Sequence, residues 1–216
     1  MESDHPDLDM TAGAVLALAP YGQDHHRLVT TATRFVLDAQ HPDGAFTPSW
    51  TLSESSVILR AIDALTAART LPAADLVRID GAIARAAARL IATQQPDGGW
   101  GHTPNSDSDP LSTAQALTVV ARHGPPHVTA AAGAHLLGRQ GDDGSFPSPP
   151  DQVGPRPLPF DYPVVADIHE LTALDRISGP PLETWPTRTP ITSPRTLCSP
   201  TLPARQRVMR KAARPT

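Results

Sequence analysis

A seven-residue phrase occurs three times in this chain and constrains its fold more than any other feature. The pattern is Gln-x-x-Asp-Gly-x-aromatic, and its copies begin 54 and then 46 residues apart (94 − 40 and 140 − 94). A phrase that recurs at such spacing indicates a protein built from structural repeats. The copies are Gln40, Asp43 and Phe46; Gln94, Asp97 and Trp100; and Gln140, Asp143 and Phe146.

The residues of the phrase are typical of a helix end. Gly adopts the left-handed conformation at no steric cost, and Asp bonds to the backbone of the turn. We expect the amide of the Gln to donate to the unpaired carbonyls at the end of its own helix, and its flat face to support the aromatic ring. These residue types indicate that the phrase ends one helix and begins the loop to the next.

Six helices are predicted, in three pairs. The first helix of each pair ends at a repeat Gln, and the second follows the Asp-Gly-aromatic loop. Ser53 and Asp109 are typical N-terminal residues of the second set. A short helix over 10–18 is also expected, either as a partner of the first pair or as a frayed end. The predicted ranges are 27–39, 79–93 and 126–139 for the first set and 54–68, 112–123 and 164–177 for the second.

The longest connection in the repeat region runs from residue 144 to residue 163. It contains seven prolines and no apolar periodicity. A structureless connection of this length indicates a functional loop or a lid.

Charge divides the chain near residue 178. Residues 1–178 carry 11 basic and 21 acidic side chains, a net of −10, whereas residues 179–216 carry seven basic and one acidic, a net of +6. We predict an N-terminal segment over 1–26, a repeat domain over 27–178 and a Pro/Arg-rich disordered tail over 179–216. A shifted reading frame is an alternative explanation of the tail. Because its positive charge is sparse, no nucleic-acid partner is expected.

Composition excludes several classes of protein. Cys198 is the single cysteine, so no disulfide forms within one chain. No apolar run approaches the ~18 residues of a transmembrane helix, and a cytoplasmic protein without a cofactor is expected.

The second repeat resembles a known family. Two of its segments are similar to the prenyltransferase and squalene-cyclase repeat, which includes the QW motif of squalene-hopene and oxidosqualene cyclases. They are residues 94–101 (QQPDGGWG) and 109–117 (DPLSTAQAL). The resemblance covers about residues 27–177 and implies an all-α fold of the α/α-toroid type. A complete toroid of that family has roughly six helix pairs, so three pairs imply a partial barrel. A homodimer or another partner is expected to complete it.

The resemblance also implies an acid. Class II terpenoid cyclases protonate an alkene or epoxide with an Asp-x-Asp-Asp motif, which needs a carboxylic acid held protonated in an apolar pocket. Here Leu111 and Ser112 occupy two of the acidic positions. The remaining catalytic candidates are Asp107 and Asp109, assisted by His102. The alternative is that both acids only cap a helix.

Protein prenyltransferases of the same family hold zinc with Asp, Cys and His. Asp109 lies where that Asp would be and His169 could imitate the His, but Leu111 replaces the Cys, so no metal site is predicted. Asp167 and Glu170 share a helix face. Either the two carboxyl groups share one proton, or the negative charge near the helix start interacts favourably with the helix dipole. The candidate substrate-binding residues are Ser112, Thr113, Asp167, His169 and Glu170.

Two functions follow from these observations. The first is a terpenoid-cyclase-like protein that binds an isoprenoid chain in a helical cavity and assists or catalyses its cyclisation. The second is a non-catalytic α/α-toroid interaction module or the remnant of a longer cyclase. Carbohydrate-active α/α barrels share the architecture but not the repeated phrase, and fold alone does not transfer function.

Overall fold

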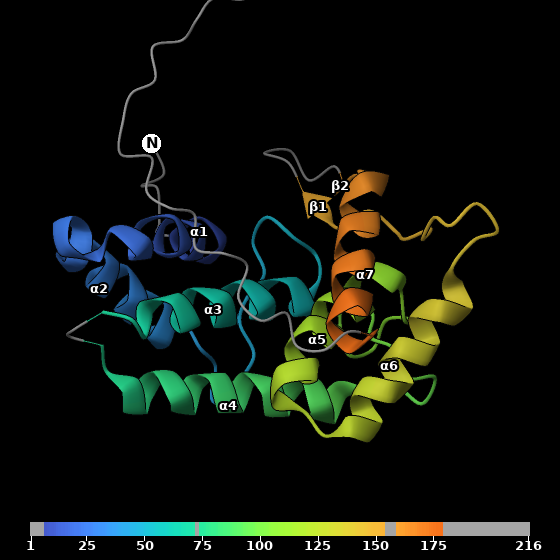
Figure 1. The fold of residues 1–216 in the computed structure, drawn as a ribbon, viewed down its shortest axis with the longest axis horizontal. Coiled ribbons are helices and arrows are strands. Elements are labelled where there is room, and N and C mark those ends of the chain that lie inside the picture. The colour runs from blue at the N-terminus through green and yellow to red at the C-terminus, as the bar shows by residue number, and fades with distance from the viewer. Residues whose placement is uncertain (1–6, 72–73, 154–158, 179–216) are drawn as a thin grey trace, which may run out of the picture. The chain divides into compact units, whose positions relative to one another are not determined.

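The computed structural model describes residues 7–71, 74–153 and 159–178, which form seven α-helices, one short 3₁₀ helix and two short strands (Figure 1). The predicted tail of 179–216 lies outside these residues, and the predicted domain boundaries stay predictions. The elements are α1 (Leu8–Leu18), the 3₁₀ helix η1 (Ala19–Tyr21), α2 (Gly22–Asp38), α3 (Glu54–Ala68), α4 (Leu76–Thr93), α5 (Pro110–His123), α6 (Pro126–Arg139), β1 (Gln152–Val153), β2 (Pro159–Phe160) and α7 (Pro163–Ser178).

Alternate helices form two layers. One layer contains α1, α3, α5 and α7, each packed on the next member of the series, and we call it the inner layer. The helices α2, α4 and α6 form the outer layer and pack against the inner helices beside them. The prediction of an all-α, α/α arrangement is confirmed. The helix expected over 10–18 is α1, a packed member of the inner layer that contacts both α2 and α3.

All six predicted repeat helices are present, and the largest difference is at the start of α2. This helix begins at Gly22, five residues before the predicted residue 27. Its first turn carries polar residues such as Asp24, whose negative charge is stabilised by the positive end of the helix dipole. The helix start was missed because a solvent-exposed first turn shows no apolar periodicity.

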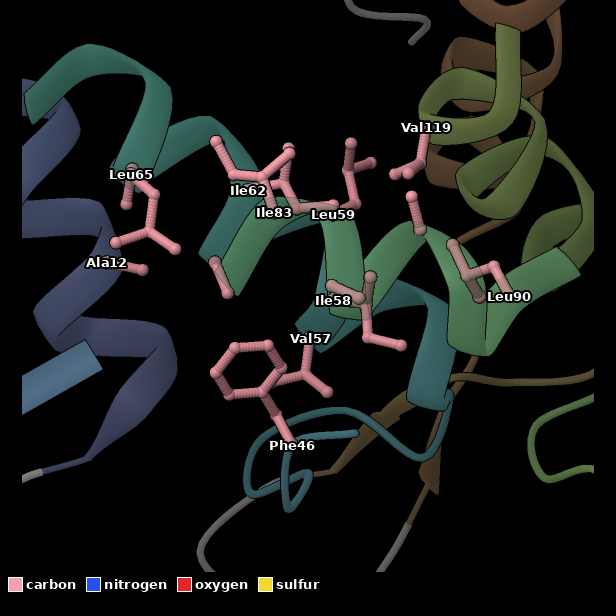
Figure 2. Close-up of a cluster of buried hydrophobic side chains, with 14 of the residues drawn as sticks. Ala12, Phe46, Val57, Ile58, Leu59, Ile62, Leu65, Ile83, Leu90 and Val119 are labelled. Carbon is pink, nitrogen blue, oxygen red and sulfur yellow. The ribbon is translucent and has the colours of Figure 1, made fainter. Parts of the chain in front are cut away.

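The core lies between the two layers. Figure 2 shows Val57, Ile58 and Leu59 of α3 among side chains of α1, α4 and α5. Phe46, the aromatic residue of the first phrase, is buried in the same cluster. The apolar faces of the separate repeats therefore make one continuous core, as expected when stacked repeats bury each other's faces.

The Gln of the repeated phrase connects successive outer helices. Gln94 Nε2 donates to Gly98 O (2.9 Å) and to Val128 O of α6 (3.0 Å). Gln40 Nε2 likewise donates to Gly44 O (3.3 Å) and to Ala82 O of α4 (2.9 Å). We call this pair of bonds the repeat clip.

The prediction that the Gln amide donates to its own helix was wrong. The backbone becomes extended at Gln94, with ψ of 131°, so the side chain turns away from the axis of α4 and toward the next outer helix. Trp100 takes the expected role, because its indole Nε1 donates to Leu90 O (2.9 Å) in the last turn of α4. That carbonyl is one of the four that a helix leaves unpaired at its end.

The Gly of the phrase is needed for two reasons. Gly44, Gly98 and Gly144 all have φ between 85° and 91°, where an L side chain is strained. At Gly98 a Cβ atom would also meet Ala131 O of α6 at 2.6 Å, and at Gly44 it would clash with Arg85 O of α4. Gly44 and Gly98 therefore allow the next outer helix to approach the loop.

The part of the proline-rich connection between α6 and α7 that the structure describes, which leaves out 154–158, contains two paired strands, so the prediction of a structureless segment was wrong there. Strands β1 and β2 pair antiparallel, with Gln152 opposite Phe160. Before them, Asp151 Oδ1 accepts bonds from Leu52 N (2.9 Å) and Ser53 N (2.7 Å) at the start of α3. The buried Asp151 carboxylate thus fixes the connection to the N-terminal end of an inner helix.

Within the described ranges, none of the helices has both the length and the apolar character to cross a membrane.

We predict that Gly98→Ala destabilises the protein more than Gly144→Ala. Both substitutions place Ala at positive φ, which costs about 1–2 kcal/mol. Only Gly98→Ala also pushes a methyl group into the backbone of α6, for which overpacking adds about 1–3 kcal/mol. Urea denaturation of both variants would measure the difference, and equal losses would show that the approach of α6 to Gly98 is not a stabilising contact.

Candidate functional site

Buried polar groups without partners concentrate where the inner helices α3 and α5 begin and where α7 packs on α5. Such groups are rare in folded proteins, because an unpaired buried polar atom costs free energy. Their concentration marks this end of the inner layer as the candidate site. Among the described residues, the unpartnered atoms here are Thr51 Oγ1, Ser53 Oγ, His102 Nε2, Ser112 Oγ, Asp151 Oδ2 and both carboxyl oxygens of Glu170.

Asp109 is the N-cap of α5 and is buried. Its Oδ1 accepts a bond from Ser112 N (2.7 Å) and another from Ser148 Oγ (3.2 Å). Ser148 in turn accepts a bond from Leu111 N (2.9 Å), so the proline-rich connection reaches α5 as well as α3. The prediction that Asp109 caps this helix is confirmed.

The protonation state of Asp109 is set by opposing effects. Burial raises the pKa of its carboxyl, and this effect exceeds the lowering by the hydrogen bonds from Ser112 and Ser148 and by the nearby His102. His102 Nε2 lies 3.9 Å from Asp109 Oδ2, beyond hydrogen-bonding distance. The predicted pair is thus close in space, while the backbone carbonyl of His102 accepts from Glu54 N (2.8 Å) at the start of α3.

Glu170 of α7 is the most unusual residue of the site. Its side chain is fully buried, with 0% exposure, and neither carboxyl oxygen has a hydrogen-bond partner. Burial first, and then repulsion by Asp167 and Asp109, raises the pKa of Glu170 to about 8. At neutral pH this side chain is therefore a neutral carboxylic acid.

The two carboxyl groups differ in what surrounds them. Asp109 receives bonds from an N–H and an O–H group, which stabilise its anion, whereas Glu170 receives none from another side chain. The repulsion between the two means that ionising both at once is unfavourable. A proton taken up by this pair accordingly resides first on Glu170.

The other predicted site residues occupy different positions. Thr113 Oγ1 accepts from Trp100 N (3.0 Å) and Asp167 Oδ1 accepts from Phe146 N (3.2 Å), so both hold aromatic loops of the repeat. Asp107 is exposed on the loop before α5, away from the buried group. His169 is half-buried, and burial together with Arg60 lowers its pKa.

Sequence reasoning missed Ser148 and Asp151. Both lie in the proline-rich connection, where no motif or periodicity marks a functional position. Their role depends on how the connection folds back over α3 and α5, which is a long-range contact. The only signal was the unusual length of the segment.

The cavities of the described part of the chain are small or open. One of about 110 Å³ lies between α2 and the start of α4, and its lining includes Thr33, Leu37 and Arg78. A cavity of about 10 Å³ adjoins the site beside Leu111, Ser148 and Asp151. Nowhere in residues 7–71, 74–153 and 159–178 do three His, Cys, Asp or Glu side chains gather as metal ligands would.

Comparison of the sequence with known proteins gives a consistent result. A sequence profile described as the squalene-hopene cyclase C-terminal domain matches residues 2–136. The chain is 41% identical over 177 residues to a drimenyl diphosphate synthase of Streptantibioticus cattleyicolor, covering 81% of this chain and 33% of the relative. It is 30% identical over 129 residues to a labda-7,13-dienyl diphosphate synthase of Streptomyces clavuligerus, covering 60% of this chain and 22% of the relative.

Comparison of the fold agrees. An ent-copalyl diphosphate synthase from Streptomyces platensis superposes with a TM-score of 0.61 at 24% identity, over 81% of this chain and 34% of that one. A protein from Actinoplanes superposes with the same TM-score at 22% identity, over 80% of this chain and 55% of that one. The chain spans about a third of the length of its drimenyl diphosphate synthase relatives, as the 33% coverage shows.

We predict that Glu170 makes the protein less stable as the pH rises. The pKa of Glu170 increases from an ordinary 4.5 in the unfolded chain to about 8 in the folded one, so the folded state holds more protons between these values. The free energy of unfolding therefore falls across this window, by up to about 1.4 kcal/mol per pH unit, and this dependence ends above the folded pKa.

Glu170→Gln keeps the shape and neutrality of the protonated side chain and should remove this fall. The variant is expected to be more stable than the unsubstituted protein near pH 8. Urea denaturation across the window measures the effect, with Asp142→Asn as the control that changes an exposed carboxyl. Parallel stability curves for Glu170→Gln and the unsubstituted protein would refute the assignment.

Proposed function

The chain belongs to the squalene-hopene cyclase C-terminal domain family, and we propose that it takes part in the cyclisation of an isoprenoid diphosphate. The family and the helical fold make the protein terpenoid-cyclase-like. The observation that carries the proposal is Glu170, a buried carboxylic acid that is neutral at physiological pH and is near enough to Asp109 to be repelled by its charge.

The names of the relatives suggest a substrate that carries a diphosphate group. Drimenyl diphosphate synthase and labda-7,13-dienyl diphosphate synthase both name products that still carry the diphosphate. A cyclisation that keeps the diphosphate has to begin at an alkene rather than by breaking the bond to that group. An alkene is activated by a proton, and this requirement matches an acid of raised pKa.

The proposed step transfers one proton. The O–H bond of the acid breaks, and the electron pair of a terminal alkene forms the new C–H bond and leaves a carbocation. Internal alkenes of the chain then close the ring or rings. Loss of a proton from a carbon beside the final cation restores an alkene, so the product is an isomer of the substrate.

The roles of the acidic residues follow from their surroundings. Asp109 retains slight exposure and contacts Ser148 beside the small cavity, so we assign it the role of the acid that meets the substrate. Glu170 is fully enclosed and makes no hydrogen bond to Asp109, so we assign it the role of a positioning residue that acts on Asp109 through its charge. His102, 3.9 Å from Asp109, is proposed to assist.

A non-catalytic toroid module is the second candidate. It is favoured by Leu111 and Ser112, which stand where the family's acidic motif would continue. It is also favoured by the size of the cavity beside the candidate site, which has a volume of only about 10 Å³.

We predict that the purified protein converts farnesyl or geranylgeranyl diphosphate into a cyclic diphosphate. In D₂O the product should gain one deuterium, because the acid supplies a solvent-exchanged proton. Asp109→Asn, which keeps an N-cap, and Glu170→Gln should each lower the rate by roughly a hundred-fold or more. Mass spectrometry of the dephosphorylated products measures both effects.

The exposed Asp107 provides a matched control, because Asp107→Asn removes a carboxyl of the same loop without touching the buried pair. If neither diphosphate nor squalene is bound or turned over, the catalytic proposal is wrong and the interaction module remains. A shift of the pH-rate profile in Glu170→Gln would separate its proposed role from a purely structural one.

A further inference from the structure

The contact between successive outer helices follows one register. Gln40 bonds to Ala82 O and Gln94 bonds to Val128 O, and each acceptor lies 12 residues before the Gln of its own helix (94 − 82 and 140 − 128). The approach of the glycines obeys the same rule. Gly44 meets Arg85 and Gly98 meets Ala131, nine residues before Gln94 and Gln140. The same interface is thus built twice.

The third copy of the phrase has the same local geometry, but among the described residues no outer helix packs against it. Gln140 Nε2 bonds to Gly144 O at 3.0 Å, and Gly144 has φ of +85°. A Cβ atom at Gly144 would meet only Gln140 Nε2 within 4 Å, whereas Gly44 and Gly98 are buried against a helix. The neighbouring Leu137 of α6 is 61% exposed. One face of this interface is therefore open.

The other face is open on α2. Applying the register to Gln40 places Leu28 and Thr31 at the receiving positions (40 − 12 and 40 − 9). Leu28 is 57% exposed, whereas its counterparts Ala82 and Val128 are 0% and 3% exposed. Thr31 is also exposed. The outer layer thus presents the two complementary halves of one repeated interface at α2 and at the end of α6.

We propose that two copies of this chain dock head to tail, with α2 of one copy packed against the loop from Gln140 to Gly144 of the other. Gln140 donates to the backbone carbonyl of Leu28 in the second copy, and Gly144 lies against Thr31. When two copies exchange this contact, each one receives and supplies an outer helix, so both open faces are buried. The proposal is independent of catalysis.

The docked interface would differ from the internal ones in its charges. At the internal interfaces, Asp43 pairs with Arg89 (3.1 Å) and Asp97 pairs with His135 (3.5 Å). Arg89 and His135 each lie five residues before the Gln that ends their own helix. The corresponding residue of α2 is Phe35. The contact between copies therefore depends on the amide and the apolar side chains, and its strength should vary little with salt.

A mixed cross-linking experiment tests the contact. In a Cys198→Ser background, one protein carries Thr31→Cys and a second carries Ser145→Cys, which keeps the glycine at position 144. Ser145 corresponds to Gly99, where an added Cβ atom would meet His135 of the next outer helix. The counterpart of His135 on α2 is Phe35, one helical turn from Thr31. After mixing and addition of a flexible bismaleimide cross-linker, we expect a linked dimer whose joined peptides contain positions 31 and 145.

Gly138→Cys is the control for Ser145→Cys. Gly138 is exposed, and open space surrounds it on α6. Mixing Gly138→Cys with Thr31→Cys should give no more cross-linking than either protein alone. If Ser145→Cys behaves in the same way as Gly138→Cys, the proposed contact does not exist.

The mass in solution provides a second test. Light scattering of the unsubstituted chain should give twice 22.9 kDa, and Leu28→Glu should reduce it to the monomer. Val77→Glu, which changes an exposed apolar residue of α4 outside the interface, should leave the mass unchanged. A monomeric unsubstituted chain, or equal effects of both variants while circular dichroism shows intact helices, would overturn the proposal.

Discussion

The bond from a repeat Gln to a backbone carbonyl of the next outer helix is the interaction on which the rest of this structure depends. It sets the spacing of the outer helices, and the Gly of the same phrase allows the close approach. With the outer helices fixed, the inner helices α3 and α5 bury their apolar faces in one core. The same contacts place the starts of these inner helices together, where the candidate site lies.

The site itself depends on the balance between burial and hydrogen bonding. Asp109 and Glu170 are both buried, but only Asp109 has donors from the surrounding chain. The site therefore separates two chemically similar groups into a hydrogen-bonded carboxyl and a neutral acid. Leu111, which replaces an acid of the family motif, leaves this arrangement without a carboxylate at the centre of the motif.

The sequence was informative wherever the structure depends on local chemistry. Helical periodicity and the three phrases predicted every helix of the repeats, and the cap at Asp109 followed from residue type alone. The partner of the Gln amide was missed because it lies on another helix, 34 residues further along the chain for Gln94. The same limit applies to Asp151, whose bonds to the start of α3 span 98 residues or more. Glu170 was a candidate, but its isolation depends on how α7 packs on α5.

The complete enclosure of Glu170 also has a kinetic consequence. A carboxylic acid without contact with water or a hydrogen-bonded neighbour has no direct route for proton exchange. Its proton leaves or returns only when the packing of α5 and α7 opens locally, and such openings are slower than proton transfer in water. The charge of Glu170 therefore reflects the pH at the last opening of the helices.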